Sequence, residues 1–130
     1  MTWQPTRDFV GYGGQPPDPR WRNGARLALN FVLNYEEGSE PSVQDGDGYS
    51  ENRLTDSSLA INGRDLAAEG MFEYGSRVGF WRIHSEFVQR GLPLTVFACA
   101  VAVERNARAA AAMVEAGNDI CCHGLRWVNH

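Results

Sequence analysis

The chain of 130 residues is long enough for one domain, and its 43% apolar and 22% charged residues are typical of a folded globular protein. Its formal net charge of −4 argues against a nucleic-acid or anionic-membrane partner. No apolar run has the length that a membrane span needs, and residues 1–6 do not resemble a secretory signal. Three cysteines, two of them adjacent, do not suit a disulfide framework, so we expect a reducing, cytoplasmic setting.

The start of the chain is rich in glycine and proline, notably in residues 11–14 and 16–19. This composition suits neither a helix nor a central strand. We therefore predict an extended arm over residues 1–25, followed by one α/β domain over residues 26–130.

Residues 26–34 form a nearly continuous apolar run, which predicts a strand buried on both faces, as in a parallel sheet. Glu36 and Glu37 follow this run, and Gly38 comes directly after them. A carboxylate at the mouth of an apolar strand is costly unless it is hydrogen-bonded, paired or employed in chemistry. Two in succession predict a functional site.

The middle of the chain is less regular. Residues 39–62 are rich in Gly, Ser, Asp and Asn and predict a long loop, which is either a lid over the site or an unstructured insertion. Residues 64–74 predict irregular structure with one helical turn. Ser76 is the expected N-cap of a helix that runs to about Arg90 and stops at Gly91.

Two further strands follow. Residues 94–100 predict an apolar strand, Asn106 is expected to cap a helix over residues 107–116, and residues 120–122 predict a third strand. Strands that alternate with helices predict a parallel sheet with right-handed crossovers. Ligands gather at the carboxyl ends of such strands. Glu36, Glu37 and His123 all lie at these ends, so we expect them to share a site.

These strand ends resemble motifs of the polysaccharide-deacetylase superfamily, also called carbohydrate esterase family four. In that family the first strand ends Thr-Phe-Asp-Asp-Gly and the third ends His-Ser/Thr-x-x-His. Here residues 34–38 read Asn-Tyr-Glu-Glu-Gly and residues 123–127 read His-Gly-Leu-Arg-Trp. The chain is more similar to the metal-independent allantoinases of purine breakdown, and this similarity covers four separate blocks, which is a specific signal. They are residues 8–13, 30–38, 73–82 and 92–97.

The resemblance implies a distorted barrel of about seven strand-helix units. This chain supplies three strands, so we expect the N-terminal portion of a (β/α)7 barrel, incomplete in this chain. By position, Glu36 matches the family's catalytic base, Glu37 its aspartate metal ligand and His123 its first metal histidine. Trp127 stands in place of the second metal histidine, and tryptophan cannot bind zinc, so we predict no metal and no other cofactor.

The activity that the resemblance implies is hydrolysis of a carbon-nitrogen bond other than a peptide bond, namely the ring opening of allantoin to allantoate. The expected catalytic residues are Glu36, Glu37 and His123, because paired carboxylates can supply a base and an acid and an imidazole can polarise a carbonyl or protonate a leaving nitrogen. The expected substrate contacts are Tyr35, Arg77, Arg126 and Trp127. For the tryptophan, a place in the core is an equal alternative.

Two other functions stay open at this point. One is a metal-dependent deacetylase acting on N-acetylated sugars or peptidoglycan, and the other is a truncated homologue without activity. We expect a small-molecule substrate such as allantoin or a similar cyclic ureide, no nucleic-acid or membrane partner, and a homo-oligomer. Cys121 and Cys122 precede His123, but small buried cysteines are common in cores, and we expect them to serve packing.

Overall fold

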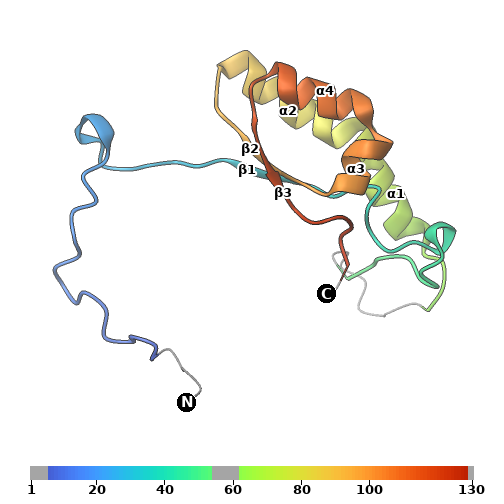
Figure 1. The fold of residues 1–130 in the computed structure, drawn as a ribbon, viewed down its shortest axis with the longest axis horizontal. Coiled ribbons are helices and arrows are strands. Elements are labelled where there is room, and N and C mark those ends of the chain that lie inside the picture. Colours follow the sequence, from blue (N-terminus) through green and yellow to red (C-terminus); the bar gives the residue numbers. More distant parts are fainter. Residues whose placement is uncertain (1–5, 54–61, 129–130) are drawn as a thin grey trace.

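The computed structural model describes residues 6–53 and 62–128, and its centre is a parallel sheet of three strands (Figure 1). The strands are β1 (Val32–Tyr35), β2 (Thr95–Ala98) and β3 (Asp119–Cys122), and their order in the sheet is β1-β2-β3. Both pairs are parallel, with Tyr35 opposite Ala98 and Ala98 opposite Cys122. The parallel α/β fold expected from the alternation of strands and helices is confirmed.

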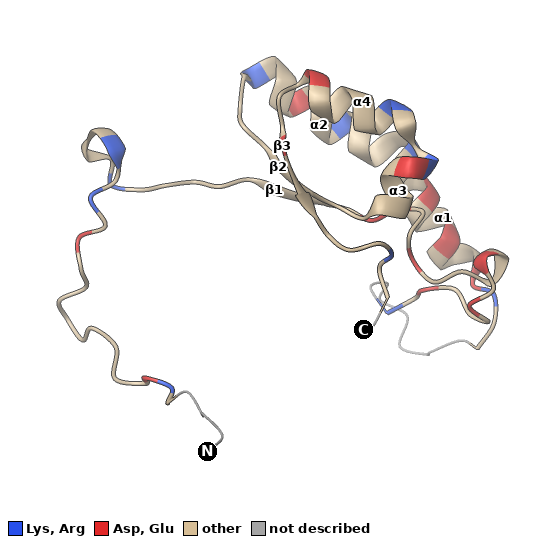
Figure 2. Ribbon diagram, viewed as in Figure 1, with Lys and Arg blue, Asp and Glu red and all other residues tan. Residues whose placement is uncertain are grey.

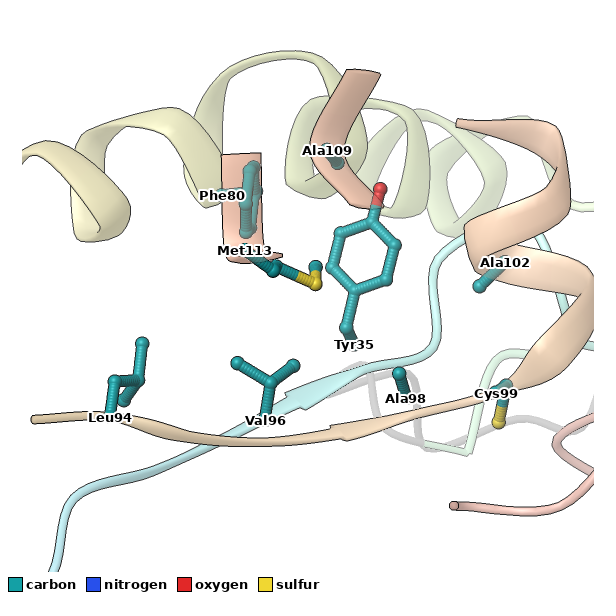
Figure 3. Packing of buried hydrophobic residues seen from close by; sticks show 9 residues of the cluster. All are labelled: Tyr35, Phe80, Leu94, Val96, Ala98, Cys99, Ala102, Ala109 and Met113. Atoms are coloured by element: carbon teal, nitrogen blue, oxygen red, sulfur yellow. The ribbon is translucent and has the colours of Figure 1, made fainter. Parts of the chain in front are cut away.

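Helices cover one face of this sheet, and the core lies between them (Figures 1 and 3). The helices are α2 (Phe80–Arg90), α3 (Ala100–Arg105) and α4 (Ala107–Glu115). Alternate residues of a strand point to the same face, so Val96 and Ala98 both enter this core. The buried cluster consists of Tyr35, Phe80, Leu94, Val96, Ala98, Cys99, Ala102, Ala109 and Met113, and among these Cys99 points to the opposite face of the sheet (Figure 3). Each fully buried aliphatic side chain here stabilises the fold by roughly 1.5–3 kcal/mol.

The other face of the sheet carries no helix in the described part of the chain (Figure 1). Parallel registration places Val32, Thr95 and Asp119 in one row of this open face, and Asn34, Phe97 and Cys121 in the next. Val32 is 49% exposed, whereas Val96 on the covered face is fully buried. The two faces therefore differ in burial as well as in composition.

The first strand is shorter than residues 26–34, and the prediction that it is buried on both faces is wrong. Residues 26–30 lie before β1 without strand pairing, and Leu27 and Leu29 are 69% and 72% exposed. The reason is that β2 begins only at Thr95, opposite Val32, so earlier residues have no partner strand. Residues 6–31 lead away from the sheet and contain a turn at residues 11–14 and a short 3-10 helix, η1 (Arg22–Gly24) (Figure 1).

The helical region before β2 starts earlier than expected. Helix α1 (Leu66–Tyr74) replaces the irregular segment predicted for residues 64–74, because Asp65 caps it by accepting hydrogen bonds from the amides of Ala67 and Ala68. A π-helical turn, η3 (Gly75–Gly79), joins α1 to α2 without a break. Ser76 lies inside this turn and is not an N-cap, so that prediction is wrong.

The ends of the later helices agree with the sequence. Gly91 adopts a left-handed conformation with φ of 59° and ends α2, and the Asn106 side chain accepts a hydrogen bond from the Ala109 amide at the start of α4. The extra helix α3 occupies residues that we assigned to the end of a strand and to a connection. None of the helices in the described ranges is both long and apolar enough to span a bilayer.

Candidate active site

The carboxyl ends of the three strands bring three polar residues into one row on the open face. Backbone bonds from Cys99 N to Tyr35 O and from His123 N to Ala98 O extend the sheet ladder just past the strands. The alternation that points Tyr35, Ala98 and Cys122 to one face therefore points Glu36, Cys99 and His123 to the other. This is the sheet edge at which the sequence predicts a site.

Glu36 and His123 meet at this edge. The Oε1 atom of Glu36 lies 2.7 Å from Nε2 of His123, across 87 positions of sequence. The Glu36 side chain is 12% exposed and the His123 side chain 34% exposed, so both are partly shielded but remain open to solvent. When Glu36 is a carboxylate, Nε2 carries the shared proton, and Oε2 of the glutamate is left to accept a second hydrogen bond.

The turn after β1 fixes the Glu36 backbone. Both the amide and the hydroxyl of Ser39 donate hydrogen bonds to the Glu36 carbonyl oxygen, at 2.8 and 2.6 Å. Gly38 between them has a φ of 94°, a conformation that glycine adopts without the strain of a Cβ atom. The turn at Gly38 therefore follows directly after β1 and holds the Glu36 side chain at the open face.

Glu37 points to the other side of the strand, away from His123. Its carboxylate packs against Gly75 of η3, where an added Cβ atom would lie 2.5 Å from Glu37 Oε1. Burial raises the pKa of Glu37 above its ordinary value, and the nearby charge of Glu36 raises it to a smaller extent. The structure therefore does not join Glu37 to the Glu36–His123 pair, although the two carboxylates are adjacent in sequence.

The four expected substrate contacts lie in different places. Tyr35 is 1% exposed in the core, where its hydroxyl accepts a hydrogen bond from Asn106. Trp127 is partly buried against the core cluster. Arg77 lies in η3, on a groove of about 910 Å³ formed with α2, and pairs with Glu73. Arg126 forms an ion pair with Asp47. Their roles in substrate binding stay predictions.

The loop after β1 contributes residues that the sequence does not single out. Asp45 of η2 (Val43–Asp45) pairs with Arg105 at the end of α3, and Asp47 pairs with Arg126 after β3. Figure 2 shows charged residues on the helices and on the loops beyond the strand ends, while the strands are mostly uncharged. Ion pairs between residues 60 and 79 positions apart leave no local sequence signal.

The residues at this edge do not by themselves fit a catalytic zinc centre. Within residues 6–53 and 62–128, no group of three or more His, Cys, Asp or Glu side chains is placed to hold a metal ion. Zinc sites normally use three protein ligands. Glu36 and His123 contact each other, Glu37 points away, and the indole of Trp127 offers no lone pair to a metal. The expectation that the protein uses no cofactor stays a prediction.

Fold and site together define an α/β protein with a parallel sheet, which has a carboxylate and an imidazole at the carboxyl ends of its strands. No family model matches the chain. A Schizosaccharomyces pombe protein named as a polysaccharide deacetylase is 42% identical over 130 residues, which is 96% of this chain and 41% of the relative. The chain is thus similar to this relative over almost its whole length, which agrees with the resemblance of its motifs.

Two solved structures are also similar. The crystal structure of the PuuE allantoinase has a TM-score of 0.83 and 44% identity, covering 98% of this chain and 43% of that one. A crystal structure named as a polysaccharide deacetylase from Pseudomonas aeruginosa PAO1 has a TM-score of 0.83 and 46% identity, covering 95% and 42%. The resemblance and the fold predicted from the motifs are confirmed, and the chain spans about two-fifths of each relative.

Proposed function

We propose that this chain carries the base and the histidine of a hydrolase that opens a cyclic amide, with allantoin or a similar cyclic ureide as substrate. The observation that carries the proposal is the 2.7 Å contact between Glu36 Oε1 and His123 Nε2 at the carboxyl edge of a parallel sheet. The 44% identity to the PuuE allantoinase supports the choice of substrate. A second expected role, that of Glu37 as a partner acid, has no support from its orientation toward Gly75.

The proposed reaction adds one water molecule across a ring carbon-nitrogen bond. Glu36 accepts a proton from the water as the oxygen attacks the ring carbonyl carbon, which requires the free carboxylate oxygen to lie within hydrogen-bond reach of that water. The bond from this carbon to the ring nitrogen then breaks, and the nitrogen takes up the proton that Glu36 received. The His123 imidazole orients the Glu36 carboxylate through Nε2. The products are a ureido group and a carboxylic acid, which releases its proton to water and becomes a carboxylate.

The second candidate is a metal-dependent N-deacetylase, which the names of the S. pombe and P. aeruginosa relatives favour. It would break an exocyclic amide of an N-acetylated sugar. The donor set at the site argues against it, because the described residues offer one carboxylate and one imidazole that already bind each other. A homologue without activity is the third candidate.

One assay separates the three functions. Purified chain is given allantoin or an N-acetylglucosamine oligomer, each with and without a metal chelator. We expect allantoate to form at a rate that the chelator does not change. Deacetylation that stops on chelation would support the second candidate, and no turnover of either substrate would support the third. Arg90→Gln, on an exposed ion pair of α2, is the control for unrelated effects of substitution.

A further inference from the structure

Glu36 and His123 belong to two segments that are far apart in sequence. Backbone bonds to Ala98, Ala100 and Val101 hold residues 123–125 to the chain after β2, so the contact with Glu36 also depends on what joins these residues to the loop after β1. Glu36 begins the loop after β1, and His123 begins the segment after β3. The sheet itself places β2 between these two strands. The carboxylate and the imidazole therefore bridge over the end of the central strand, and small movements of either segment would separate them.

Arg126 connects the two segments directly. Its two terminal nitrogens bind the two carboxylate oxygens of Asp47 at 3.0 and 2.6 Å, and one of them also donates to the Glu40 carbonyl oxygen at 3.1 Å. A backbone bond from Trp127 N to Ser39 O, at 3.1 Å, lies beside this ion pair. Bidentate bonds between guanidinium and carboxylate fix orientation as well as distance.

The ion pair is partly buried, which strengthens it relative to a surface pair. The side chains of Arg126 and Asp47 are 26% and 20% exposed. The Asp47 carboxylate also accepts a hydrogen bond from the Ser42 amide at 2.9 Å, so the acid is held within its own loop. The same loop has a second acid, Asp45, which binds Arg105 of α3 through two hydrogen bonds and lies farther from Arg126, with 4.0 Å between its Oδ2 and Arg126 Nη2.

We infer that Arg126 and Asp47 are a positioning pair, which holds the segment after β3 against the loop after β1 and keeps Glu36 within hydrogen-bond reach of His123. Arg126 thus acts on the site from outside it, and this differs from the direct substrate contact expected from the sequence. The importance of the contact for turnover rests on the proposed function, whereas the contact itself can be observed without substrate.

The test uses nuclear magnetic resonance of the ¹⁵N-labelled chain, because a hydrogen-bonded ring N–H exchanges slowly enough to be seen. The His123→Gln variant assigns the signal of the His123 ring. We expect the signal in the unsubstituted chain and its loss in Arg126→Gln and in Asp47→Asn. Arg126→Lys keeps the positive charge but loses the two parallel N–H groups that bind the carboxylate, and should weaken the signal. Arg64→Gln removes an ion pair with Glu69 that involves neither Arg126 nor Asp47, and should leave the signal in place.

Circular dichroism shows which variants are folded. If Arg126→Gln does not fold, Arg126→Lys tests whether Arg126 holds His123 against Glu36. A signal unchanged in the folded Arg126 and Asp47 variants would overturn the inference, and so would its absence from the unsubstituted chain. In the allantoin assay these variants should lower kcat by up to about a hundredfold with little change in KM. If the signal is lost as expected but no variant or parent hydrolyses allantoin, the proposed function fails and the positioning pair stands.

Discussion

The covered and open faces of the sheet come from the same three strands, but the covered face contributes the buried core, whereas the open face carries the candidate catalytic residues. On the covered face, Val96, Tyr35 and Ala98 are almost without exposed surface (Figure 3). On the open face, Glu36 and His123 form a polar contact that remains accessible to solvent. Because strand alternation assigns each residue to one face, neighbours in sequence can serve the two purposes separately.

Glu36 and Glu37 show this division most directly. They are adjacent and chemically alike, but Glu36 contacts His123 on the open face while Glu37 packs against Gly75 on the side of the helices. A pattern of two acids in a row therefore does not define a pair that works together. The geometry at the strand end decides which acid reaches the site.

The largest effect should come from Glu36→Gln, which removes the proton acceptor and keeps the size of the side chain. We expect turnover of allantoin to fall by about a hundred- to ten-thousandfold, with the circular dichroism spectrum unchanged. Arg90→Gln is the matched control on the outer surface of α2. Undiminished turnover would show that Glu36 is not the base.

The two faces should also differ in what a valine contributes to folding. Val96→Ala removes two methyl groups from the core and should lower the free energy of unfolding by about 2 kcal/mol. Val32→Ala on the open face should lower it by about 0.5 kcal/mol or less, because this side chain is already half exposed. Urea unfolding measures both. Equal losses would mean that Val32 is covered in solution, for example by a second copy of the chain.

Glu37→Gln should stabilise the chain, and more so as the pH rises. Burial raises the pKa of Glu37, so the folded state holds this proton more tightly than the unfolded chain does. The carboxyl thus costs stability as the pH rises from the unfolded pKa, about 4.3, through the folded pKa. Urea unfolding at pH 4 and pH 7 should show that the free energy of unfolding of Glu37→Gln exceeds that of the parent by more at pH 7 than at pH 4. If the difference in free energy of unfolding between the variant and the parent does not change with pH, burial does not raise the pKa of Glu37.

A small effect should come from Asp45→Asn. Hydrogen bonds from Arg105 lower the pKa of Asp45, so its contribution to stability is complete above the unfolded pKa, about 3.9, and is lost as the pH falls through the folded pKa. We expect a loss of about 0.5–1 kcal/mol at pH 7, because the ion pair is partly exposed. Thermal unfolding should show that variant and parent converge in acid. A constant difference at all pH values would assign the effect to packing.

Much of the fold could be read from the sequence, because the relevant signals are local. The apolar run before Cys99, the Asn106 cap and Gly91 each specify structure through their own neighbours. Helix α1 was missed because Gly70 and Gly75 lower helix propensity, whereas the Asp65 cap favours the helix. The true start of β1 was missed because it depends on where a distant strand begins.

The candidate site was predictable in part for the same reason. The edge of the sheet and the approach of Glu36 to His123 follow from strand order in a parallel fold. The opposite orientation of Glu37 depends on Gly75, and the use of Arg126 depends on Asp47, 79 positions away. Such long-range pairings have no periodic pattern, so composition and spacing do not reveal them.

The π-helical turn between α1 and α2 sets the rotational phase of the two helices. Ala68 and Phe80, their buried residues, are twelve positions apart, which in an unbroken α-helix would place them about 120° apart around the axis. A π turn takes up about one additional residue, and this reduces the offset to roughly 20°. Deleting one residue from Gly75–Gly79 would therefore restore regular helical bonding and keep Ala68 and Phe80 on the same side, whereas α-helical bonding through this turn without a deletion would rotate one of them out toward water.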